Sequence, residues 1–140
     1  MSDEPTSNLP PDLPRPRHTV ARAFYCAILG VVELFQQGRN ARIQFVAGAI
    51  AIGLAIWLRC APIEWAILSL TIGLVLACEG LNTAIELAVD LASPEIHPLA
   101  GRSKDMAAAA VLIASIAAVG VGVAIFVPKL IARFGATLPQ

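Results

Sequence analysis

The sequence predicts an all-α membrane protein, with an N-terminal amphipathic surface helix followed by three transmembrane helices. Of its 140 residues, 57% are hydrophobic and 14% are charged, whereas about a quarter of the residues in a soluble domain are charged. The apolar residues gather in three blocks, 43–58, 66–78 and 107–127, as expected of helices that cross a bilayer. The net charge is zero and basic residues do not alternate with aromatic ones, so nothing indicates a nucleic-acid partner.

The N-terminal region divides into a tail and a helix. Residues 1–17 hold five of the ten prolines and no apolar segment of a signal peptide, so we expect a disordered tail. Over 19–38, apolar residues recur at spacings of three and four, and Thr19 is a candidate cap. This pattern is typical of an amphipathic helix lying on a membrane surface, and a helix packed on a soluble partner is the alternative.

The three blocks predict transmembrane helices over 41–59, 63–91 and 104–127, within a membrane domain of residues 18–135. A turn at 59–62 makes the first two spans an antiparallel hairpin. The segment 93–103 contains two prolines and a glycine, which predict a loop, and Pro128 is expected to end the third span. Seven of the ten basic residues lie in the N-terminal region, in this loop or, for Lys104, directly after it, so we place the N-terminus in the cytoplasm.

The end of the second span carries polar residues where lipid disfavours them. At 100° per residue they share one stripe about 100° wide; its members are Glu79, Asn82, Thr83, Glu86 and Asp90. Glu79 lies about 24 Å from the start of the helix, near the cytoplasmic boundary of the hydrocarbon core. Acidic residues in this position usually face the protein interior and mark function.

Simpler interpretations of the stripe remain open. Glu86 and Asp90 could be interfacial residues that pair with Arg102 or Lys104, and Asn82 could be an interhelical hydrogen-bonding residue.

A second polar group lies at the expected start of the third span. Lys104 and Asp105 are adjacent there, and unpaired backbone amides beside a lysine suit a phosphate group. Carboxylates opposite a cation form a plausible site for Mg²⁺ and a nucleotide, although an ion pathway would use similar residues. The sequence contains no GxxxxGK[ST] phosphate-binding loop.

Two stretches, "EGLNTAIELAVD" and "SPEIHPLAGRSKDMAAAAVL", closely resemble the small bacterial integral-membrane diacylglycerol kinases and the related undecaprenol kinases. The resemblance implies a homotrimer in the bacterial inner membrane, with active sites between subunits near the cytoplasmic face. It implies ATP as donor, Mg²⁺ as cofactor, and the hydroxyl of diacylglycerol or undecaprenol as acceptor.

The resemblance also assigns roles by position. Glu79 would be the general base beside the lipid hydroxyl, and Glu86 would hold Mg²⁺ at the nucleotide. Asn82, Lys104 and Asp105 would contact the nucleotide, and Asp90 would support that end of the site.

Two positions depart from the family pattern. In "QQGRNAR", Gly38 occupies the place of a second metal-binding glutamate, with Glu33 nearby but out of register. Thr19 replaces an arginine that contacts the nucleotide, so Arg17 or Arg22 is expected to serve, Arg17 being the first choice. A catalytically degenerate lipid-binding or structural subunit of the same fold is therefore the alternative function, and a small cation conductor is a third.

Overall fold

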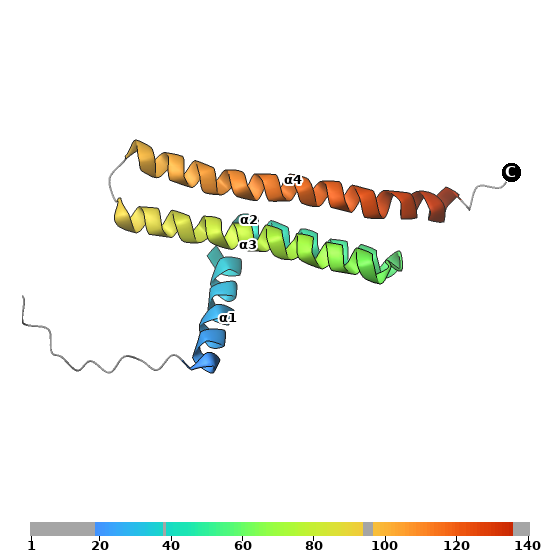
Figure 1. Ribbon diagram of the computed structural model, residues 1–140, viewed down its shortest axis with the longest axis horizontal. Coiled ribbons are helices and arrows are strands. Elements are labelled where there is room, and N and C mark those ends of the chain that lie inside the picture. The colour runs from blue at the N-terminus through green and yellow to red at the C-terminus, as the bar shows by residue number, and fades with distance from the viewer. Residues whose placement is uncertain (1–18, 38, 94–96, 136–140) are drawn as a thin grey trace, which may run out of the picture.

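Four helices make up the chain as far as the structure describes it (Figure 1). The computed structural model describes residues 19–37, 39–93 and 97–135, so the expected tail over 1–17 lies outside it. The helices are α1 (Val20–Gln37), α2 (Arg39–Trp57), α3 (Pro62–Ala92) and α4 (Pro98–Gly135). The all-α prediction is confirmed, and α2, α3 and α4 are long and apolar enough to cross a membrane.

Helices α2, α3 and α4 run alongside one another, and α1 extends across their common direction (Figure 1). The expected hairpin between α2 and α3 is present. Arg59 makes the turn with a positive φ of 52°, and Pro62 begins α3, where its fixed φ suits the first helical position. The carboxylate of Glu64 accepts a 2.6 Å hydrogen bond from the Ala61 amide and pairs with Lys129 of α4 at 2.9 Å, which holds this end of the bundle together.

The bundle buries few large side chains. Its main apolar cluster lies near the α2–α3 turn and consists of Ala55, Leu58, Leu68, Ile125 and Phe126. Large apolar side chains elsewhere remain exposed, among them Leu70 at 75% and Ile113 at 68%. Apolar surface on this scale needs lipid or further protein to cover it, in agreement with a membrane protein.

Helix α1 packs on α2 and α3 through its C-terminal half. Phe35 meets Phe45 of α2 edge to face, with ring centroids 5.3 Å apart. Gly80 of α3 lies under Leu34, where an added Cβ would be 3.6 Å from the leucine side chain. The helix expected over 19–38 is therefore present, and its position on a membrane surface stays a prediction.

Helix α4 is longer than the sequence suggested at both ends. Residues 98–103 were expected in a loop, but Pro98 begins the helix, and His97 accepts a 3.3 Å hydrogen bond from the Gly101 amide. Pro128 was expected to end the helix, but it lies inside it. Proline is tolerated inside membrane helices, and α4 continues for two turns past Pro128, where Arg133 stacks on Trp57 with 4.7 Å to the ring centroid.

Candidate active site

The face of α3 that packs inside the bundle changes from apolar to polar along the helix. Its buried residues are Leu68, Val75, Glu79 and Asn82. Glu79 is only 3% exposed and Asn82 9%, so these side chains lie within the protein. Leu81, on another face of α3, is 64% exposed. The polar stripe predicted from helical spacing therefore continues the face of α3 that packs inside the bundle.

Glu79 is held by a residue that the sequence analysis did not select. The amide Nε2 of Gln44, on α2, donates a 3.0 Å hydrogen bond to Glu79 Oε2. An amide inside the otherwise apolar block 43–58 was the available signal, because buried polar groups in membrane helices need partners. Thr83, by contrast, bonds the backbone carbonyl of Glu79 at 3.0 Å, which is a local contact within α3.

Asn82 and Glu86 form the next pair, one helical turn further along α3. Asn82 Nδ2 donates a 2.9 Å hydrogen bond to Glu86 Oε1. The other amide atom of Asn82, Oδ1, is buried and has no hydrogen-bond partner. A buried unpaired oxygen is unfavourable by about 1–3 kcal/mol, so a cation or a donor group at this position would stabilise it.

The oxygens of this pair fit Mg²⁺ in kind. Mg²⁺ binds one or two carboxylates and completes its shell with phosphate oxygens and water, and Glu86 beside the unpaired Asn82 Oδ1 offers such donors. No group of three or more His, Cys, Asp or Glu side chains gathers at metal-binding distance within 19–37, 39–93 and 97–135.

Asp90 and Lys104 join the ends of α3 and α4 at this side of the bundle. The Lys104 ammonium forms an ion pair with Asp90 Oδ1, and their side chains are 36% and 64% exposed. The interfacial pairing considered from the sequence is thus present within one subunit. The next residue, Asp105, is exposed.

The expectation that unpaired helix amides lie beside Lys104 is wrong, because α4 begins at Pro98. Lys104 lies six residues after Pro98, in the second turn of α4, and only the first four amides of a helix lack intrahelical partners. Lys104 can therefore offer its side chain, but its backbone amide belongs to the helix interior.

The two departures from the family pattern fall near α1. Arg17 and Gly38 lie outside the described residues, and Arg22 is exposed in the first turn of α1. Glu33 lines a cavity of about 560 Å³ between α1 and α3, together with Gly80 and Thr83 of α3. Of the polar stripe this cavity includes Thr83 alone, so within the described residues Glu33 faces the side of α3 next to the stripe.

The chain is similar to known bacterial lipid kinases. Residues 25–126 match the family described as prokaryotic diacylglycerol kinase. The chain is 37% identical over 109 residues to an undecaprenol kinase of Bacillus subtilis, covering 78% of this chain and 89% of that protein. It is 44% identical over 110 residues to a diacylglycerol kinase of Synechocystis, covering 78% and 63%. It is 47% identical over 74 residues to a diacylglycerol kinase of Escherichia coli, covering 53% and 61%.

Proposed function

The chain belongs to the prokaryotic diacylglycerol kinase family and is a lipid kinase, and from this premise we propose that it phosphorylates the hydroxyl of a membrane lipid alcohol with ATP. The acceptor is undecaprenol or diacylglycerol, the two alcohols named by its relatives. The reaction takes place at the cytoplasmic face of the bacterial inner membrane, with the N-terminus on the same side.

The buried carboxylate of Glu79 carries this proposal. It lies at the inner end of the polar stripe, where an alcohol anchored by an apolar chain would present its hydroxyl. Glu79 accepts the hydroxyl proton as the oxygen attacks the γ-phosphorus of ATP, and the bond to ADP breaks. A carboxylate in surroundings of low polarity is suited to this role as a general base.

The remaining polar residues bind the nucleotide. Asn82 and Glu86 lie one turn beyond Glu79, followed by Asp90 with Lys104 and Asp105 from α4. The Lys104 ammonium neutralises phosphate charge, and Arg17 or Arg22 adds a cation from the α1 side. Phosphoryl transfer depends mainly on such positioning and charge stabilisation.

Mg²⁺ would be held by Glu86, with Asn82 Oδ1 as a neighbouring oxygen. When bound, it neutralises the phosphate oxygens and orients the transferred group. With Gly38 in place of a glutamate, phosphates and water supply the other ligands, and Glu33, the acidic residue of α1, is a candidate to assist.

A homotrimer accounts for the exposed apolar surface. Each subunit exposes large apolar side chains along α2, α3 and α4, and contacts between subunits would cover part of them. The sites would then lie between subunits, with α1 along the membrane surface beside the α3 stripe.

A substrate panel tests the proposal directly. Purified protein in detergent micelles is incubated with labelled ATP, Mg²⁺ and either undecaprenol or diacylglycerol, and labelled lipid is extracted and counted. We expect labelled lipid with at least one alcohol and a loss of labelling when the metal is chelated. No labelling of either alcohol, in an assay where an active lipid kinase labels both, would refute the proposal.

A further inference from the structure

We propose that Gln44 is a positioning residue that orients the Glu79 carboxylate for proton transfer. The role rests on the proposed function, because it concerns the same base, but it assigns a task to a residue of α2 that the family resemblance did not supply. The juxtaposition that carries it is a half-buried glutamine on α2 bound to a buried carboxylate on α3.

The geometry restrains Glu79 from one side. Gln44 Nε2 donates to Oε2 of the carboxylate at 3.0 Å, across 35 residues of sequence. A hydrogen bond to one carboxylate oxygen fixes rotation of the group and leaves Oε1 available to an incoming hydroxyl. Because Glu79 is 3% exposed, bulk water cannot readily replace this donor.

The oxygen atom of the Gln44 amide indicates that this residue does more than join α2 to α3. Its Oε1 is buried and has no hydrogen-bond partner. A buried acceptor left unpaired is unfavourable, and association of α2 with α3 alone would favour a residue whose polar atoms are all satisfied. A ligand hydroxyl or a water molecule reaching Glu79 would supply the missing donor.

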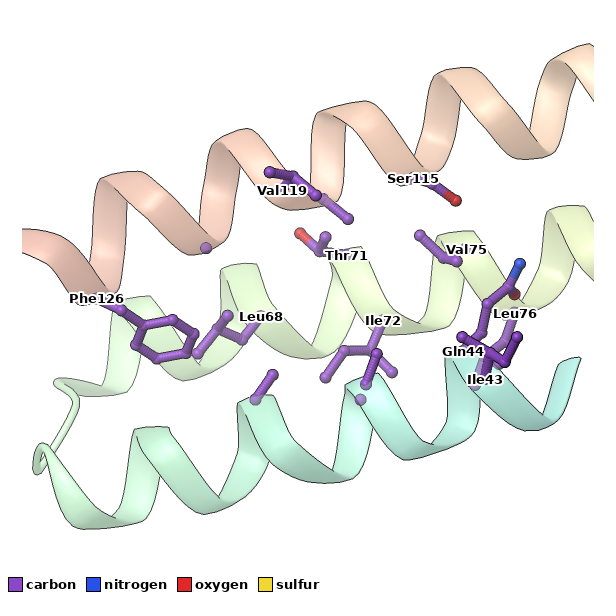
Figure 2. Close-up of a pocket in the computed structure, with 15 residues that line it drawn as sticks. Ile43, Gln44, Leu68, Thr71, Ile72, Val75, Leu76, Ser115, Val119 and Phe126 are labelled. Carbon is purple, nitrogen blue, oxygen red and sulfur yellow. The ribbon is translucent and has the colours of Figure 1, made fainter. Parts of the chain in front are cut away.

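Gln44 also stands at the end of an apolar cavity. The cavity has a volume of about 330 Å³ and lies between α2, α3 and α4. Its labelled lining runs from Phe126, near the α2–α3 turn, to Gln44 at the other end (Figure 2). The cavity also contains Thr71, but Thr71 Oγ1 bonds the carbonyl of Ile67 at 2.7 Å within its own helix. Gln44 therefore connects the cavity lining to the base, and Thr71 offers a matched control.

The first measurement separates positioning from packing. Gln44→Met keeps the length of the side chain and removes the hydrogen-bond donor. Gln44→His restores an N–H at a similar reach, and Thr71→Val removes a hydroxyl from the same cavity.

We expect Gln44→Met to lower kcat about 10- to 100-fold with the KM for ATP unchanged, since misplacement of a reacting group by about 1 Å can lower the rate about 100-fold. Gln44→His should recover most of kcat, and Thr71→Val should behave as wild type. Wild-type kcat in Gln44→Met, or equal losses in the Met and His variants, would overturn the role.

A second measurement does not depend on turnover. A hydrophobic carbodiimide modifies protonated carboxyl groups, and mass spectrometry locates the adduct. Loss of the amide donor leaves Oε2 of Glu79 without its 3.0 Å hydrogen bond, so Gln44→Met should be modified at Glu79 several-fold faster than wild type. The His variant and Thr71→Val should match wild type. Equal modification in wild type and Gln44→Met would refute positioning, and Gln44→Leu repeats the test if the Met variant does not assemble.

The two measurements also keep the two proposals apart. If wild type labels no lipid, the proposed function fails, yet the carbodiimide contrast at Glu79 still decides whether Gln44 holds that carboxylate. If wild type is active and the contrast is absent, the function stands and the positioning role of Gln44 is wrong.

Discussion

Replacing Glu79 by glutamine removes the proposed base while preserving the packing around it. The two side chains have nearly the same shape, and an amide at this position can still accept the 3.0 Å hydrogen bond that Gln44 Nε2 donates. Glu79 is almost completely buried, and a neutral amide is easier to bury than a carboxylate. The variant should therefore fold and assemble at least as well as wild type.

The expected effect on turnover is large. A positioned general base contributes about 10²- to 10⁴-fold, or about 3–5 kcal/mol of the activation free energy. At 3% exposure Glu79 has little contact with bulk water, which is therefore a poor substitute base. We expect Glu79→Gln to lower kcat for lipid phosphorylation by this factor, with little change in the KM for ATP, in the labelled-ATP micelle assay.

Glu64→Gln provides the matched control. Glu64 lies on the same helix at the opposite end, where it pairs with Lys129 at 2.9 Å. The same substitution there should lower thermal stability slightly and leave kcat unchanged. Retention of more than a tenth of wild-type kcat by Glu79→Gln, in protein of normal thermal stability, would refute the assignment of the base.

Three further predictions concern other parts of the molecule. Gly38→Glu should reduce the Mg²⁺ concentration needed for half-maximal activity, because a second carboxylate adds a ligand; no change in that concentration would contradict a metal role for this position. Lys104→Met should raise the KM for ATP about 10- to 100-fold, since a charge-assisted hydrogen bond contributes about 1.5–3 kcal/mol, and an unchanged KM would place Lys104 outside the nucleotide site. Gly48→Ala should give a lower thermal midpoint than Gly53→Ala on the same helix, because an added Cβ at Gly48 would lie 3.2 Å from Ile72 whereas Gly53 faces open space; equal midpoints would contradict close α2–α3 packing.

Helix positions were predictable because they depend on local patterns. Apolar blocks of sufficient length indicated α2, α3 and α4, and a spacing of three and four indicated α1. The ends of α4 were not predictable from Pro98 and Pro128, because a proline is compatible with the first turn of a helix and, in a membrane bundle, with its interior. Which of these applies depends on the packing of the whole bundle, which the residues around each proline do not specify.

The sequence by itself determined that Glu79, Asn82 and Glu86 share one face of a helix, because the helical period places every third and fourth residue together. Its motifs also determined the family. Only the tertiary structure decided that this face is buried, that Gln44 of α2 holds Glu79, and that Lys104 meets Asp90 from the second turn of α4. These contacts join residues of different helices, and their pairing depends on how the helices pack, which no local pattern specifies.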